Sequence, residues 1–175
     1  GSAEQITSRA MPLLQLGAVA AELDIVSEQL VKNRIQRSID RLMTVQRTDG
    51  AFAMWSAQGP AEMWLTAYVV DFLGRAREAG YRVPELPLRK SVEWLNGVLD
   101  NAWFDEAELA ARAYALYTLA GAKAVDVAEV RYFQETWWAA LPTRIARAQI
   151  ASALARLGDG GRAADAFNQL DRSRE

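Results

Sequence analysis

Apolar side chains recur every three or four residues along most of the chain, and they almost never alternate with a period of two. The series Val31, Ile35, Ile39 and Leu42 is one example. This spacing places apolar side chains on one face of a helix, whereas a half-buried strand needs strict alternation. The periodicity therefore predicts an all-α fold.

Glycine, proline and short polar residues divide this periodic sequence into segments, because helices rarely continue through them. The breaks fall at 48–50, 59–60, 80–87, 100–101, 121, 142 and 158–161. We expect helices near residues 3–16, 28–46, 61–79, 87–99, 106–121, 126–138, 142–157 and 160–171.

Short similarities between these segments indicate a repeating architecture. Arg112-Ala113 with Leu119 aligns with Arg147-Ala148 with Leu154. Repeated helix pairs with short Gly-containing turns are typical of stacked αα-hairpins, which form an open solenoid or close into a ring. Many alanines on the later helices favour the ring, an α/α toroid, because they allow close helix approach. We expect residues 1–175 to form a single domain whose toroid is partial or truncated.

Composition argues against several functional classes. The 175 residues carry 20 basic and 22 acidic side chains without a long run of like charge, which disfavours contact with nucleic acid or a membrane surface. No segment has the roughly 18 apolar residues of a membrane span, and the N-terminus lacks the layout of a signal peptide. Because the chain has no cysteine, disulfides and thiolate metal sites are excluded, and we expect no metal and no other cofactor.

The N-terminal tetrapeptide Ser2-Ala3-Glu4-Gln5 has the spacing of a thioester-forming motif. In a complete motif a Cys thiol attacks the carboxamide of the Gln, releases ammonia and leaves a strained acyl donor. Here the first position is a serine hydroxyl, a far weaker nucleophile, and the chain has no histidine to activate it. Gln5 is therefore expected to remain an amide. Glu4 also suits the positive end of a helix.

Three segments together resemble the thioester domain of α2-macroglobulins, especially the bacterial ones. Residues 1–9 resemble its Gly-Cys-x-Glu-Gln-x-Thr-Ser segment, with Ser2 in place of Cys. Residues 46–55 resemble its Gln-x-x-Asp-Gly-x-Phe…Trp turn, and residues 64–70 its Trp-Leu-Thr-Ala-Tyr helix. A different origin of Ser2 stays open, since Gly-Ser also remains after cleavage of an expression tag and a Cys can be replaced by design.

The resemblance implies a domain of a larger, multidomain, broad-spectrum protease inhibitor that is not an enzyme. In thioester-bearing relatives a protease cleaves a bait region, the inhibitor rearranges, and the exposed thioester acylates a lysine of the protease. Ser2 then holds the sulfur position and Gln5 the acyl-donor position, with Ala3 and Glu4 between them. Candidates for shielding this motif from water are Trp55, Trp64 and Tyr68.

The same resemblance implies two kinds of partner, namely target proteases and other domains of the parent chain. It also implies an exported, membrane-anchored parent in the periplasm or cell envelope, although this domain itself makes no membrane contact. With Ser2 as written, the thioester chemistry is expected to be inactive.

Two other classes stay open. Gln46-x-x-Asp49-Gly50-x-Phe52 also resembles the repeat of terpene cyclases and prenyltransferase subunits, but the Asp-x-Asp-Asp motif or zinc ligands of those enzymes are missing. A helical-repeat scaffold that binds protein through a concave face is the second alternative, and an exposed apolar patch would support it. In each case we expect Phe52 and Trp55 to be core anchors.

Overall fold

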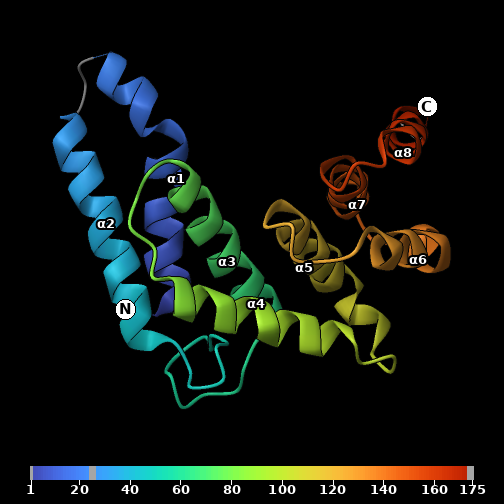
Figure 1. Ribbon diagram of the computed structural model, residues 1–175, viewed down its shortest axis with the longest axis horizontal. Helices are drawn as coiled ribbons and strands as arrows, with labels where there is room; N and C mark the ends of the chain where they lie inside the picture. Colours follow the sequence, from blue (N-terminus) through green and yellow to red (C-terminus); the bar gives the residue numbers. More distant parts are fainter. Residues whose placement is uncertain (1, 24–26, 173–175) are drawn as a thin grey trace. The chain divides into compact units, whose positions relative to one another are not determined.

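The computed structural model describes residues 2–23 and 27–172, and all regular structure within these ranges is helical. The all-α prediction is therefore confirmed. The helices are α1 (Ala3–Glu22), α2 (Glu28–Val45), α3 (Met63–Glu78), α4 (Glu85–Leu99), α5 (Leu109–Gly121), α6 (Val127–Trp137), α7 (Arg144–Arg156) and α8 (Gly160–Arg172) (Figure 1). Short 3-10 segments, Glu106–Glu108 and Trp138–Ala140, precede α5 and follow α6.

Most helix boundaries lie within a few residues of the predicted ones, but the first helix is longer than expected. It continues through Gly17 to Glu22 instead of ending near residue 16. Gly17 faces α2 so closely that a Cβ there would lie 2.7 Å from Val31 Cγ1. This glycine therefore permits close helix approach and does not end the helix.

The described residues form two compact units, Gly1–Trp94 and Leu95–Glu175, with the boundary inside α4. We call them unit 1 and unit 2. The expectation that residues 1–175 form a single domain stays a prediction. Within the described ranges, no helix is long and apolar enough to cross a membrane.

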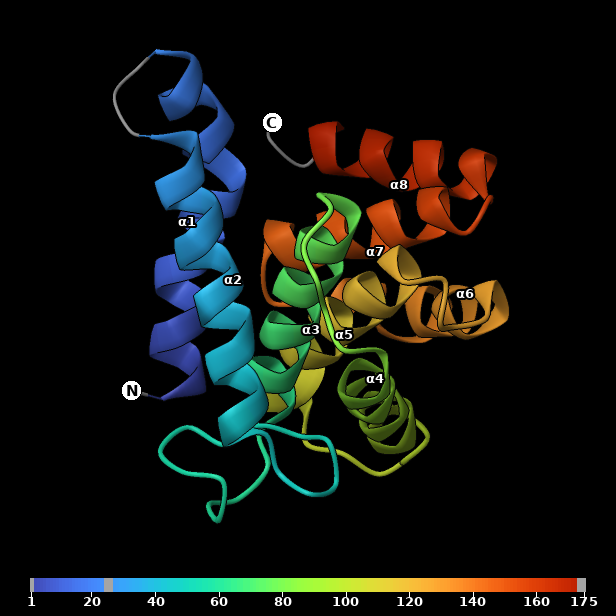
Figure 2. The ribbon, with the colours of Figure 1, turned by 60° about the vertical axis from the view of Figure 1, so that its left-hand side comes forward.

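In unit 1, α1 contacts both α2 and α3, and the three helices lie side by side (Figure 2). The predicted apolar stripe of α2 is buried, and Ile35, Ile39 and Leu42 have at most 1% of their surface exposed. Leu65 and Phe72 of α3 are fully buried as well. Burial of each such side chain contributes about 1.5–3 kcal/mol, so these stripes hold the unit together.

The loop between α2 and α3 is fixed by hydrogen bonds to α4 and by one buried aromatic ring. Gln46 Nε2 donates to Pro87 O (2.9 Å) and Ser91 Oγ (2.9 Å). Gly50 has a φ of 95°, and a Cβ there would lie 2.4 Å from Lys90 O, so only glycine fits. Phe52 is fully buried, which confirms that it is a core anchor.

Trp55, in the same loop, is 86% exposed, so the expectation that it is a core anchor was wrong. Glu62 N donates to Phe52 O (3.0 Å) and so closes the loop segment that contains Trp55, and Gly59 N donates to Ser56 O (3.0 Å) in a turn after Trp55. The loop backbone is therefore closed by its own hydrogen bonds, while the Trp55 side chain remains outside the core.

In unit 2, α7 contacts α5, α6 and α8. Alanines occupy fully buried positions where these helices meet, as the small-residue pattern predicted; among them are Ala113, Ala120, Ala146 and Ala153. Side chains without a long stem let neighbouring backbones approach closely, so the alanine-rich segments of the sequence form the inner part of this unit.

The two arginines of the predicted repeat have equivalent positions in unit 2. Arg112 donates to Val98 O, Leu99 O and Asn101 O at the end of α4, over distances of 3.0–3.3 Å. Arg147 donates to Trp138 O (3.1 Å) and Ala139 O (3.3 Å) after α6. Each arginine thus donates to backbone carbonyls at or just after the end of the preceding helix.

Candidate thioester-like site

Ser2 and Gln5 face each other at the start of α1. The backbone N–H of Gln5 donates to Ser2 Oγ, and the backbone N–H of Ser2 donates to Gln5 Oε1, both over 3.3 Å. Ile6 N donates to Ser2 O (3.0 Å), which is the first hydrogen bond of the helix. This reciprocal arrangement is a capping box, in which two side chains satisfy two backbone donors at a helix N-terminus.

The capping box and the thioester motif need the same spacing. A thioester joins the side chains of residues i and i+3, and a capping box pairs Ser or Thr at i with Glu or Gln at i+3. With Ser2 present, the structure uses the spacing to begin a helix. Sequence reasoning missed this use, although Ser-x-x-Gln before an apolar series is a recognised signal for it.

The motif residues differ in burial because they lie on different faces of α1. Ala3 and Ile6 point into unit 1, with 2% and 4% of their surface exposed. Glu4 is partly buried, and Gln5 is exposed. The carboxamide of Gln5 therefore lies on the outer face of a helix whose inner face is anchored in the core.

A short chain of polar contacts connects Glu4 to α3. Ser8 Oγ donates to Glu4 Oε1 (2.9 Å) and lies 3.3 Å from the Tyr68 hydroxyl oxygen. The ring of Trp64 lies against the ring of Tyr68, with 5.1 Å between centroids and 32° between planes. The structure thus brings Glu4, Tyr68 and Trp64 together through Ser8, the last residue of the Gly-Cys-x-Glu-Gln-x-Thr-Ser resemblance, to which the sequence analysis gave no role.

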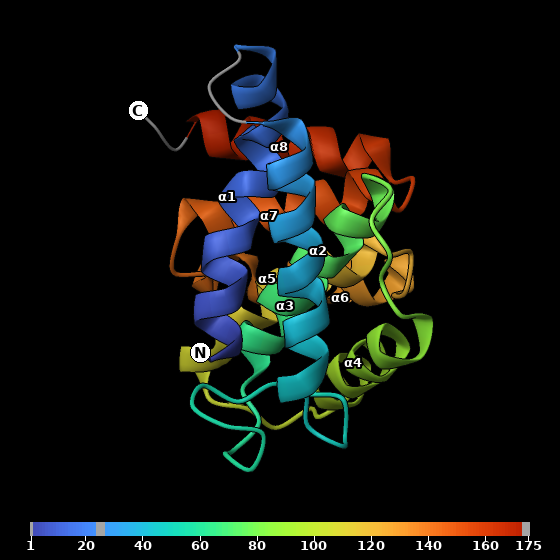
Figure 3. The same cartoon turned by 90° about the vertical axis from the view of Figure 1, so that its left-hand side faces the viewer.

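Two of the three proposed shielding residues are exposed, Trp55 at 86% and Trp64 at 41%. The loop of Trp55, residues 46–62, and the start of α1 lie at the same end of unit 1 (Figure 3). The loop also carries an ion pair between Arg47 Nε and Asp49 Oδ1 (3.1 Å). Hydrogen bonding from Arg47 holds the pKa of Asp49 below its ordinary value.

The polar side chains at the start of α1 take part in hydrogen bonds within the helix. The Ser2 hydroxyl oxygen accepts a hydrogen bond from the backbone of Gln5, and the Glu4 carboxylate accepts one from Ser8. The sequence has neither a histidine nor a cysteine. Residues 2–23 and 27–172 contain no cluster of three or more acidic, His or Cys side chains suited to a metal ion.

Comparison with known proteins identifies relatives for nearly the whole chain. The A-macroglobulin TED domain family matches residues 5–120. Alpha-2-macroglobulin of Escherichia coli K12 is 32% identical over 181 residues, which cover 95% of this chain and 11% of that protein. The chain thus spans about a tenth of the length of this relative.

Solved structures agree with this match. Native E. coli alpha-2-macroglobulin, from domain MG7 to the C-terminus, superposes with a TM-score of 0.86 at 31% identity, over 97% of this chain and 28% of that one. The trypsin-activated E. coli protein superposes with a TM-score of 0.84 at 31% identity, over 97% of this chain and 12% of that one. These likenesses confirm the predicted α/α toroid class.

The family assignment places the chain with the alpha-2-macroglobulins and not with the terpene cyclases or prenyltransferases. Family match, sequence identity and structural likeness all cover more than half of the chain. The chain belongs to the A-macroglobulin thioester-domain family, as a homologue of the bacterial alpha-2-macroglobulins.

Proposed function

We propose that this chain is one domain of a larger bacterial protease inhibitor that traps proteases after bait cleavage, and that Ser2 stands at the position of the thioester cysteine. The observation that carries the second part is the reciprocal contact of Ser2 and Gln5, at 3.3 Å in each direction. Activation of the related E. coli protein by trypsin supports proteases as targets.

With a hydroxyl at position 2, the parent inhibitor works without covalent capture. An unactivated carboxamide is a poor acyl donor, and the serine hydroxyl lacks a base that would raise its reactivity. The inhibitor therefore holds its target by enclosure, and this domain contributes contacts with other domains of the parent chain. By family inference, the parent acts in the periplasm or cell envelope.

In this proposal Tyr68 and Trp64 shield the motif from the side of α3. Their support is the hydroxyl contact from Tyr68 to Ser8 and the ring contact between the two aromatic side chains. Trp55 is 86% exposed, so in this proposal it shields the motif only when it packs against a neighbouring domain of the parent.

The test restores the sulfur. We expect Ser2→Cys, in the full parent protein, to lose one ammonia by intact mass and to take up methylamine at Gln5. A matched variant that combines Ser2→Cys with Gln5→Ala controls for labelling elsewhere, because it keeps the thiol and removes the acyl donor. An intact mass without ammonia loss, together with no labelling of the folded parent, would refute the placement of Ser2.

A further inference from the structure

The end of unit 1 opposite the motif exposes large apolar side chains. These residues belong to the last part of α1 and the first part of α2, far from the start of α1 (Figures 2 and 3). The exposed fractions are 63% for Leu16, 53% for Val19 and 42% for Leu30. Single exposed apolar side chains are ordinary on a protein surface, so these three residues do not by themselves mark an interaction surface.

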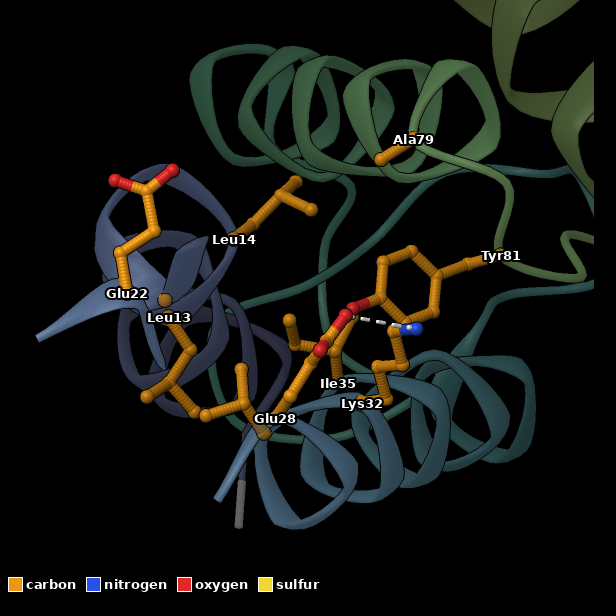
Figure 4. A pocket seen from close by; sticks show the side chains of 10 residues that line it. Leu13, Leu14, Glu22, Glu28, Lys32, Ile35, Ala79 and Tyr81 are labelled. Carbon is orange, nitrogen blue, oxygen red and sulfur yellow. Dashed lines mark ion pairs between the residues drawn. The ribbon is translucent and has the colours of Figure 1, made fainter. Parts of the chain in front are cut away.

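A pocket with a cavity volume of about 430 Å³ lies in the same unit, between α1, α2 and the residues that follow α3 (Figure 4). Leu13, Leu14, Val31 and Ile35 supply apolar walls from α1 and α2. Ala79, which follows α3, closes another side. The volume falls within the range of about 300–1,000 Å³ that is typical of ligand pockets.

The frame of the pocket is already formed in the free chain. The close approach of Gly17 to Val31 fixes the spacing of α1 and α2 beside it. Tyr81, at the rim, is held through its backbone N–H, which donates to Ala76 O (3.0 Å). Burial raises the pKa of the Tyr81 hydroxyl, so this group stays neutral. A preformed site avoids part of the ordering cost of binding.

The polar rim is acidic on balance. Glu22 and Glu28 line the pocket together with a single cation, Lys32, which forms an ion pair with Glu28 over 3.1 Å. This charge pattern disfavours an anionic lipid surface and favours a basic partner, because complementary charges steer and orient association. The apolar walls require that the same partner also present an apolar side chain.

We propose that this pocket is a docking site for another domain of the parent chain, which inserts an apolar side chain flanked by a Lys or Arg. The inference rests on the proposed function in one respect, that the chain is part of a larger protein. The chain spans 11% of its E. coli relative, so most of such a parent lies outside these residues. The docking site lies at the opposite end of unit 1 from Ser2 and does not depend on thioester chemistry.

The experiment compares hydrogen exchange in the 175-residue chain and in the full parent protein. We expect amides of residues 10–23 and 28–36 to exchange at least tenfold more slowly in the parent. Ala79→Trp fills the pocket and should return these amides to the rates of the isolated chain. Leu86→Trp is the matched control, because Leu86 is 58% exposed on α4 and does not line the pocket.

Charge reversal tests the stated chemistry of the partner. Glu22→Lys in the parent should raise exchange of the same amides several-fold, whereas Glu78→Lys, outside the pocket, should leave it unchanged. Equal exchange in the isolated chain and the parent, or no effect of Ala79→Trp, overturns the docking site. No effect of Glu22→Lys overturns the basic partner.

Two further outcomes would assign the pocket to another occupant and so overturn the proposal. One is a dimer of the isolated chain, measured by light scattering, that Ala79→Trp converts to a monomer. The other is flotation of the isolated chain with phosphatidylglycerol vesicles that Ala79→Trp abolishes. Failure of the proposed function is seen separately, as absence of ammonia loss in Ser2→Cys, and leaves the exchange result interpretable.

Discussion

Replacing Arg112 tests whether the buried guanidinium stabilises unit 2. Only 5% of this side chain is exposed, and it donates three hydrogen bonds to carbonyls at and after the end of α4. Its Cζ lies 3.8 Å from the centroid of the Phe104 ring. Arg112→Met keeps much of the apolar stem but removes the donors and the charge.

The expected loss follows from these contacts. A hydrogen bond is worth about 1 kcal/mol net, somewhat more from a charged donor, and a desolvated cation–π contact about 2 kcal/mol. Removing the buried charge offsets part of this loss of stability. Arg112 Nε has no hydrogen-bond partner among the described residues, and burial lowers the pKa of the guanidinium. We expect Arg112→Met to lower the free energy of unfolding by about 3 kcal/mol.

Urea denaturation followed by far-UV circular dichroism measures this change as a lower midpoint at constant slope. Arg89→Met is the matched control, since Arg89 is 58% exposed and pairs with Glu85 on the surface of α4. Exposed pairs of this kind contribute about 0–1 kcal/mol. If Arg112→Met is as stable as the Arg89→Met control, the guanidinium does not stabilise the end of α4 and the reasoning is wrong.

Three further predictions concern other positions. Ser2→Ala removes half of the capping box and should lower the unfolding free energy by about 1 kcal/mol, whereas Ser2→Asp should retain most of it; thermal melts compare the two. Gly17→Ala should lower the melting temperature although alanine has the better helix propensity, because the added Cβ would lie 2.7 Å from Val31 Cγ1. A higher melting temperature for Gly17→Ala would contradict this contact. So would a Gly17→Ala, Val31→Ala double variant that is no more stable than Gly17→Ala alone. Hydrogen bonding from Arg131 over 2.7 Å lowers the pKa of Asp159 in the folded chain. The ionised Asp159 carboxylate therefore stabilises the fold above its ordinary pKa of 3.8, and this stabilisation is lost as the pH falls through the lower pKa of the folded state. The melting temperature of Asp159→Asn should therefore fall less on acidification than that of the unchanged chain.

The candidate site was predictable in part. The offset of three residues between Ser2 and Gln5, and the aromatic pair Trp64 and Tyr68 at i and i+4, are local patterns, and the structure places both pairs in contact. The contact between Ser8 and Tyr68 was not predictable, because the two residues lie 60 positions apart in the chain. The exposure of Trp55 was predicted wrongly, since the same motif buries Phe52 fully and leaves Trp55 outside.

Local patterns were sufficient for the helical class and for most helix boundaries, because helix hydrogen bonds and caps connect residues only a few positions apart. Helix packing decided the rest. Packing against α2 explains why α1 continues through Gly17. Packing also brings Gln46 within hydrogen-bonding distance of Pro87 and Ser91, which lie more than 40 positions away, and it forms the pocket between α1 and α2. Such contacts depend on the distance and register between helices, which periodicity within one helix does not encode.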